Sequence, residues 1–307
     1  MSKKLSIVIP LYFNEKNLPV TYAKLASDVF PHLADYELIL VDDGSKDNSY
    51  QEALKLRALN PQVKVIKLSR NFGQHTAIYA GLEHISGDCA VVISADLQDP
   101  PVLILKLFKK YLEGNKVVLA VRQERQESFY QKLFASTYYK LMKKYAITDM
   151  PLGGFDCFLA DKQVIDVLTK IEEKNTSLFA QVLWLGFQRA EVAYTRESRK
   201  IGKSSWTFAK KFKLALDSLL AFSYVPIRII SLVGLLDCIF SLIYATYVIF
   251  QKIAFGANAG WSSLMVAMMF TSGVQMLTLG IIGEYLWRNF DESRKRPLYV
   301  LDEKHGL

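Results

Sequence analysis

Short apolar runs alternate with segments of mixed polarity over about the first 120 residues of the chain. The apolar runs have the length of buried strands, and the intervening segments carry apolar residues at helical spacing. This alternation predicts an α/β fold, in which a mostly parallel sheet has helices on both faces. The expected strands are 6–11, 36–41, 63–68, 89–93 and 117–121, and the expected helices are 15–30, 46–59, 73–85 and 100–113.

The pattern is less regular after the fifth expected strand. Helical spacing predicts helices over 129–145, 162–171 and 178–185, and Gly153-Gly154-Phe155 predicts a turn. Residues 206–222 form an amphipathic pattern just before a long apolar run. This position favours a helix in the membrane interface over an ordinary surface helix packed on the sheet domain.

Two long apolar runs follow, at 227–250 and 264–287. Each is longer than the roughly 20 residues that a bilayer crossing needs, so we expect a transmembrane hairpin rather than two buried helices of a soluble protein. Arg228 and Glu284 lie near the ends of the runs, where side chains reach the interface. Asp237 lies deeper and is expected to face the other helix or a partner subunit.

Charge sets the expected orientation of this hairpin. The connector 251–263 holds one Lys, whereas Arg and Lys crowd both outer flanks. The positive-inside rule therefore places both ends of the chain in the cytoplasm, and no signal-peptide pattern opposes this. Because much of the net charge of +8 lies beside the membrane, we expect contact with anionic membrane lipid and no binding of nucleic acid.

The cysteines and histidines argue against a disulfide framework and against a structural zinc site. Cys89, Cys157 and Cys238 are scattered and odd in number, which favours a reducing compartment over a disulfide framework. The four His are dispersed and the cysteines lack metal-ligand spacing, so a structural zinc is not expected.

Polar residues follow four of the expected strands. Because the carboxyl ends of parallel strands form the ligand-binding edge of an open sheet, we expect these residues to meet there. Asp96 and Gln98 offer the hard oxygens that suit Mg²⁺ or Mn²⁺ on a diphosphate, although Asp96 could also only help to cap the next helix. That helix is expected to open at Asp99, as N-cap, with prolines in its first turn.

The other strand ends complete a candidate nucleotide site. Asp42 or Asp43 can accept hydrogen bonds from a base or ribose, and Arg70 with the amides that open the helix at Gly73 suits phosphate. The chain has no G-x-x-x-x-G-K-[ST] loop, and no G-x-G-x-x-G follows the first strand. P-loop enzymes and dinucleotide folds are therefore disfavoured.

The segments P-L-Y-F-N-E, V-D-D-G-S, R-N-F-G and A-D-L-Q-D-P-P together resemble family 2 glycosyltransferases with the GT-A fold. The two apolar runs make the chain similar to polyprenyl-phosphate glycosyltransferases, a group that includes bactoprenol glucosyltransferases and dolichol-phosphate mannose synthases. The resemblance covers essentially the whole chain and does not identify the sugar.

The resemblance implies a role for each matching position. It implies that Asp96 and Gln98 bind the metal and that Asp96, Asp156 and Arg199 are catalytic. The implied nucleotide-sugar residues are Pro10, Tyr12, Glu15, Asp42, Asp43, Arg70 and Gly154, and the implied acceptor-phosphate residues are Arg196, Arg199, Lys203 and Ser204. Arg122 and Arg125 are weaker candidates, for which a solvated loop is expected.

Two positions depart from the family pattern. The metal motif is often D-A-D, but Ser94 stands in place of its first carboxylate, so Asp96, Gln98 and the diphosphate would hold the metal. The turn motif is often G-D-F, but here Gly154 occupies the middle position, and Asp156 is the candidate substitute.

The resemblance implies the following organisation: a cytoplasmic GT-A catalytic domain (1–199), a basic amphipathic juxtamembrane segment (200–225), a two-helix transmembrane hairpin (226–288) and a cytoplasmic tail (289–307). The expected protein is a multi-pass protein of the cell membrane that forms homo-oligomers, with Gly234, Gly273, Gly280 and Gly283 allowing close helix packing.

The expected reaction is inverting transfer of a hexose, with glucose favoured, from a UDP-sugar to undecaprenyl or another polyprenyl phosphate, for cell-wall or surface-polysaccharide glycosylation. The alternatives are a different acceptor, a processive polysaccharide synthase, or a non-enzymatic scaffold that binds sugar nucleotides. The processive group carries Q-x-x-R-W, but the segment after Gln181 lacks the Arg-Trp pair. The missing carboxylate at Ser94 favours the scaffold, whereas Asp96, Gln98 and the basic segment favour the enzyme.

Overall fold

The computed structural model describes residues 3–122, 140, 143, 150–151, 154–174, 176–195, 217, 220–223, 225–256 and 260–307. The chain divides into two compact units. The sheet unit comprises Met1–Leu219 and Pro297–Leu307, and the helical unit comprises Leu220–Arg296.

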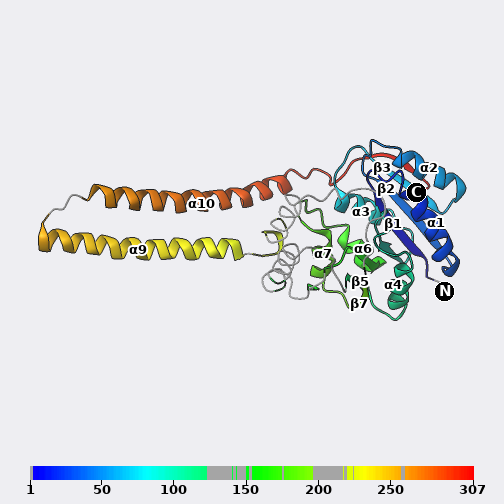
Figure 1. The fold of residues 1–307 in the computed structure, drawn as a ribbon, viewed down its shortest axis with the longest axis horizontal. Helices are drawn as coiled ribbons and strands as arrows, with labels where there is room; N and C mark the ends of the chain where they lie inside the picture. The colour runs from blue at the N-terminus through cyan, green and yellow to red at the C-terminus, as the bar shows by residue number, and fades with distance from the viewer. Residues whose placement is uncertain are drawn as a thin grey trace. The chain divides into compact units, whose positions relative to one another are not determined.

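An eight-stranded sheet forms the centre of the sheet unit, as far as its residues are described, in the order β7-β5-β6-β4-β1-β2-β3-β8. The strands are β1 (Leu5–Leu11), β2 (Tyr36–Asp42), β3 (Val63–Leu68), β4 (Cys89–Val92), β5 (Val117–Arg122), β6 (Cys157–Asp161), β7 (Arg189–Tyr194) and β8 (Leu301–His305). The helices around it (Figure 1) are α1 (Leu18–Asp28), η1 (Phe30–His32), α2 (Ser49–Leu59), α3 (Gln74–Glu83), α4 (Leu103–Leu112), α6 (Lys162–Leu168) and α7 (Leu178–Trp184).

The strand directions gather most of the loops at one edge. β1 pairs in parallel with β2 and β4, and β2 pairs in parallel with β3. β6 is antiparallel to both β4 and β5, so β5 and its parallel partner β7 run in the same direction as β1. The carboxyl ends of β1 to β5 and β7, and the start of β6, therefore share one edge of the sheet, which we call the carboxyl edge.

The alternating pattern is confirmed for β1 to β5 and α1 to α4, with helices that begin later than expected. The sequence did not predict β6, β7 or β8. β7 and β8 carry exposed and polar residues at the two edges of the sheet, where pairing with one neighbour is enough to form a strand. The expected helix 129–145 and most of the expected helix 206–222 lie outside the described residues.

Apolar side chains on both faces of the central strands form the core. Val8, Ile39 and Val91 have no exposed surface, and Phe158 is the largest of the described side chains that are fully buried. α3 packs closely on the sheet at Gly81, because a Cβ atom there would lie 2.4 Å from Val8 Cγ1. Such contact leaves no space for a larger residue.

The last residues of the chain return to the sheet unit. β8 pairs antiparallel with β3, and the Ser69 amide donates to the Val300 carbonyl at 3.0 Å. Lys67 Nζ lies 2.7 Å from Asp302 and 3.1 Å from Glu303. The segment expected only as a tail thus supplies an edge strand.

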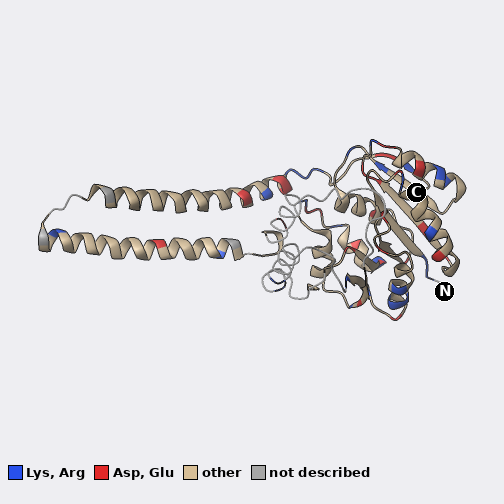
Figure 2. Cartoon of the chain, viewed as in Figure 1, with Lys and Arg blue, Asp and Glu red and all other residues tan. Residues whose placement is uncertain are grey.

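The helical unit contains α9 (Val225–Phe255) and α10 (Trp261–Ser293). Their spans Ile227–Ala254 and Ser263–Ser293 are long and apolar enough to cross a membrane, and none of the tested window in either span is buried. This exposure argues against two core helices of a soluble protein. Figure 2 shows long stretches of both helices without Lys, Arg, Asp or Glu.

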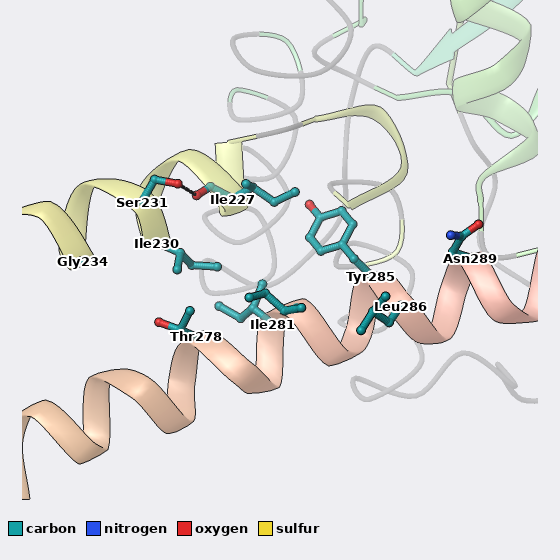
Figure 3. A pocket seen from close by; sticks show the side chains of 10 residues that line it. Ile227, Ile230, Ser231, Gly234, Thr278, Ile281, Tyr285, Leu286 and Asn289 are labelled. Atoms are coloured by element: carbon teal, nitrogen blue, oxygen red, sulfur yellow. Dashed lines mark hydrogen bonds between the residues drawn. The ribbon is translucent and has the colours of Figure 1, made fainter.

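A cavity of about 640 Å³ lies between the first turns of α9 and the C-terminal half of α10. Apolar side chains dominate its lining, including Ile227, Ile230 and Ile281, while the Tyr285 ring lies beside Ile227 (Figure 3). The helices are therefore not in close contact there. A Cβ atom at Gly234, Gly273, Gly280 or Gly283 would meet no atom within 4 Å, so these glycines mediate no close α9–α10 packing.

One buried carboxylate ties β1, β2 and β3 together at the opposite edge of the sheet. The Glu37 side chain, which is 2% exposed, accepts hydrogen bonds from Ser6 Oγ and the Ser86 amide, each at 2.6 Å, and lies 2.6 Å from Lys64 Nζ. Burial alone would raise the pKa of Glu37, but the bonds from Lys64, Ser6 and Ser86 together lower this pKa from 4.5 to about 2. A lowered pKa stabilises the folded state above pH 4.5, and this stabilisation is lost as the pH falls towards 2.

We predict that Glu37→Gln lowers the free energy of unfolding at pH 7 by about 3 kcal/mol, because the amide cannot replace the charge. The deficit should shrink by about half at pH 3. Thermal unfolding of the detergent-purified protein and of the variant, each at pH 7 and at pH 3, measures this difference in the free energy of unfolding. Glu113→Gln, which removes an exposed pair with Lys110, is the control and should change little. Equal Glu37→Gln deficits at both pH values would contradict the role of charge.

Candidate functional site

The loops after β2 and β3 are joined at the carboxyl edge by Asp43. Its carboxylate accepts hydrogen bonds from the backbone amides of Phe72 at 2.7 Å and Gly73 at 2.9 Å. Gly44 then turns with φ of +65°, and a Cβ atom there would lie 2.4 Å from the carbonyl carbon of Arg70. Only glycine meets both conditions without displacing the neighbouring loop.

Asp42 and Asp43 are two adjacent carboxyl groups that are both buried. Burial raises the pKa of Asp43 to about 6, although the two amide hydrogen bonds oppose this shift. Burial also raises the pKa of Asp42, against the hydrogen bonds from Ser45. Oδ1 of Asp42 has no hydrogen-bond partner in the part of the chain that the structure describes.

The loop after β1 rests on the loop after β2. Glu15 Oε2 accepts a hydrogen bond from the Asn48 amide at 3.2 Å, and the Glu15 amide donates to Asp47 Oδ2 at 3.3 Å. Tyr12 is 42% exposed and meets the Phe13 ring edge-on at 4.6 Å. The loop therefore presents an exposed aromatic surface beside the buried pair of aspartates, and Pro10 precedes it within β1.

Arg70 lies in the loop between β3 and α3. Its guanidinium carbon lies 4.2 Å from the centroid of the Phe72 ring, and its side chain is exposed. α3 begins at Gln74, so the backbone amides of its first turn lie close to Arg70 in the chain. A cation and helix-opening amides in one loop suit a phosphate group.

The exit of β4 holds a compact polar turn. Ser94 Oγ lies 2.8 Å from Asp96 Oδ1 and 3.2 Å from Asp99 Oδ2, and the Gln98 amide donates to Asp96 Oδ1 at 3.2 Å. Leu97 adopts a positive φ of 56°, which turns the backbone between Asp96 and Gln98. This turn brings the backbone of Gln98 to the carboxylate of Asp96.

The prediction that Asp99 caps α4 is wrong. α4 begins at Leu103, after a turn in which the Leu103 amide bonds to the Pro100 carbonyl at 2.9 Å, and its N-cap residue Val102 offers no side-chain bond. Asp99 is instead 1% exposed, and the Tyr194 hydroxyl donates to its Oδ1 at 2.5 Å. The consecutive prolines delay the helix, which frees this carboxylate for contacts inside the sheet unit.

Asp156 lies at the same edge, directly before β6, and forms an ion pair with Arg122 at the end of β5. The expectation of a solvated loop is wrong for Arg122, because its side chain is only 11% exposed. Arg122 also contacts the Tyr194 hydroxyl. Gly154 has φ of +63°, so it can form the turn that precedes Asp156.

Sequence reasoning assigned no role to Tyr194 and took Asp99 for a cap. Their pairing joins β7 to the exit of β4 across β5 and β6, and such a contact leaves no local signal in the sequence. Gly153, Arg125, Arg196, Arg199, Lys203 and Ser204 lie outside the described residues.

The donors at the β4 exit are suited to a shared cation. The described residues hold no group of three or more His, Cys, Asp or Glu side chains that could bind a metal ion. Mg²⁺ often takes one or two carboxylates from a protein and completes its coordination with substrate phosphates and water. The Asp96 carboxylate and the Gln98 amide oxygen fit a cation of this kind.

Comparison with known proteins identifies the family. The model of glycosyl transferase family 2 matches residues 6–169. The glycosyltransferase YkcC of Bacillus subtilis is 38% identical over 304 residues, which cover 98% of this chain and 94% of the relative. The SfII prophage-derived bactoprenol glucosyl transferase of Shigella flexneri is 32% identical and covers 98% of both chains. A prophage bactoprenol glucosyl transferase homolog of Escherichia coli is also 32% identical, over 97% of this chain and 98% of the relative.

These matches extend along almost the full length of the chain, and the family model spans the strands whose ends form the site. The chain therefore belongs to glycosyl transferase family 2, as a glycosyltransferase with the GT-A fold.

Proposed function

We propose that the protein transfers a hexose, with glucose favoured, from a UDP-sugar to a polyprenyl phosphate, of which undecaprenyl phosphate is the first candidate. The observation that carries this proposal is a sheet edge with Asp42, Asp43, Asp96 and Gln98 in a chain that also has two membrane-length helices. Relatives whose names state bactoprenol glucosyl transfer match nearly the whole chain and support both the sugar and the lipid acceptor.

The uridine is proposed to bind over the loops after β1 and β2. The exposed Tyr12 ring can stack on a base, and Pro10 and Glu15 shape the same loop. Asp42 and Asp43 are proposed to contact the uridine, and Asp43 also holds the Arg70 loop through its two amide bonds. Arg70 would then bind a phosphate of the UDP group.

Asp96 and Gln98 are proposed to hold Mg²⁺ or Mn²⁺ on the diphosphate. When bound, such a cation neutralises the charge that develops on the departing UDP. The protein itself orients the donor through the β4 exit and the Arg70 loop. Gly154 is proposed to line the sugar pocket.

The acceptor needs positioning more than deprotonation. A phosphate monoester has a second pKa of about 6, so its oxygens are largely ionised at neutral pH. Arg196, Arg199, Lys203 and Ser204 are proposed to hold this phosphate in line with the anomeric carbon. In-line attack would invert the anomeric configuration. Asp156 is proposed to act beside them, oriented by Arg122.

The membrane arrangement is proposed from the sequence and the two apolar helices. Residues 1–199 would form the catalytic domain at the cytoplasmic face of the cell membrane, followed by the basic segment 200–225, the hairpin 226–288 and the final segment 289–307. Homo-oligomers and contact with anionic lipid remain part of this proposal. The product would serve cell-wall or surface-polysaccharide glycosylation.

The reaction is tested with detergent-purified protein, undecaprenyl phosphate, Mg²⁺ or Mn²⁺ and a panel of radiolabelled UDP- and GDP-sugars. We expect acid-labile label in the organic phase from UDP-glucose, because a glycosyl phosphate is cleaved by mild acid. Intact nucleotide binding without lipid label from any donor would favour another acceptor or a non-enzymatic scaffold.

Asp96→Ala should abolish transfer, because it removes the only carboxylate proposed to bind the cation. The loss should reach about 10³-fold or more, the scale expected when a main electrostatic contribution is removed. Initial rates of lipid glycosylation measure the effect. Asp28→Ala, at the last residue of α1, is the control. Unchanged activity of Asp96→Ala would refute the metal assignment.

Gly44→Ala should weaken UDP binding about 10-fold or more, because a Cβ atom 2.4 Å from the Arg70 carbonyl carbon would push apart two loops proposed to hold the nucleotide. Calorimetric titration with UDP measures the change. Gly114→Ala is the matched control, since it also has a positive φ but no atom within 4 Å of the new Cβ. Equal losses in both variants would point to general backbone strain.

A further inference from the structure

The Ser94 hydroxyl lies between two carboxylates. Its oxygen is 2.8 Å from Asp96 Oδ1 and 3.2 Å from Asp99 Oδ2. A hydroxyl has one proton and two lone pairs, so it can donate a full hydrogen bond to only one of these acceptors at a time. The direction of that proton decides whether the lone pairs of Ser94 point towards Asp96 or away from it.

Asp99 is fixed from its other side. It is 1% exposed, and its Oδ1 accepts the Tyr194 hydroxyl at 2.5 Å, which leaves Oδ2 facing Ser94. Tyr194 is itself 5% exposed and contacts Arg122, which pairs with Asp156. The carboxylate therefore has a set orientation, supported by the ends of β5 and β7 and the start of β6.

We propose that Asp99 and Tyr194 are positioning residues that make Ser94 the third oxygen donor of the cation site. Asp99 Oδ2 accepts the hydrogen bond donated by the Ser94 hydroxyl, so that the lone pairs of the Ser94 oxygen would be available to a cation held by Asp96 and Gln98. This inference rests on the proposed function, because it assumes that the β4 exit binds the cation on the diphosphate.

The charge arrangement explains how a neutral residue serves at this position. A cation held by Asp96 would repel the Ser94 proton, which favours donation of that proton's hydrogen bond to Asp99. Polarised by the carboxylate behind it, the serine oxygen becomes a better donor to a cation than an isolated hydroxyl. In the family pattern a carboxylate at this position would supply negative charge directly. Here Asp99 supplies that charge through its hydrogen bond with Ser94.

A purely structural role for Asp99 is the competing explanation. In that case Asp99 and Tyr194 would hold β7 against the β4 exit, and their loss would lower stability whatever residue stood at position 94. The two explanations differ in whether the effects of Ser94 and Asp99 on cation binding are coupled.

The test is a double-mutant cycle on the full chain in detergent, with Mn²⁺ as the probe and saturating UDP present. The signal of unbound Mn²⁺ in electron paramagnetic resonance gives the apparent Kd, without any need for turnover. Ser94→Ala and Asp99→Asn should each raise this Kd about 10-fold, the usual effect of losing such a partner. The double variant should also stay near 10-fold, because both changes break the same link.

Three further variants guard against misfolding. Ser94→Thr keeps the hydroxyl and should bind Mn²⁺ like the unaltered protein. Tyr194→Phe should raise the Kd for Mn²⁺, as Asp99→Asn does. Tyr111→Phe is the matched control, since the Tyr111 hydroxyl bonds to Asp161 at 3.0 Å at the opposite edge of the sheet. It should leave the Kd unchanged.

An unchanged Kd for Ser94→Ala, or a roughly 100-fold rise in the double variant, would overturn the proposal, since independent effects multiply. If the unaltered protein binds UDP but no Mn²⁺, the cation site of the proposed function fails together with this inference. If it binds Mn²⁺ and Ser94→Ala binds equally well, only this inference fails.

Discussion

Parallel pairing of β1 with both β2 and β4 determines where the chemistry of this protein can take place. Because the three strands run in one direction, the polar loops that follow them must meet at a single edge. β6 runs the other way, yet it strengthens this arrangement, since its first residue lies where β4 and β5 end. Asp43 then fixes the distance between two of these loops with a pair of amide hydrogen bonds.

The sequence could predict this edge because the strands that build it are buried and carry continuous apolar runs. Every residue of β1 to β4 is buried, except that Pro10, Tyr36 and two lysines of β3 are half-buried. The candidate residues Asp42, Asp43, Asp96 and Gln98 followed directly from the ends of those runs. Edge strands are different: β8 reads L-D-E-K-H, and only its partner β3 makes it a strand.

The contacts between side chains could not be predicted either, because they too depend on which strands become neighbours. Asp99 precedes two prolines, so its local sequence favours a helix cap, and only the placement of β7 reveals Tyr194 as its partner. Arg122 is the last residue of an apolar strand and precedes a charged segment, which predicted a solvated side chain, but it forms an ion pair with Asp156. In both cases the deciding contact joins residues far apart in the chain, and no periodicity records it.

The return of the chain to β3 makes the helical unit an insertion within the sheet unit rather than an appendage at its end. Residues 301–305 are synthesised after both apolar helices, so the sheet cannot acquire its last strand until the hairpin has left the ribosome. Until then β3 presents an unpaired edge, the kind of surface on which strands of other molecules assemble. Completion of the catalytic sheet is thereby ordered in time after synthesis of the segment that is proposed to enter the membrane.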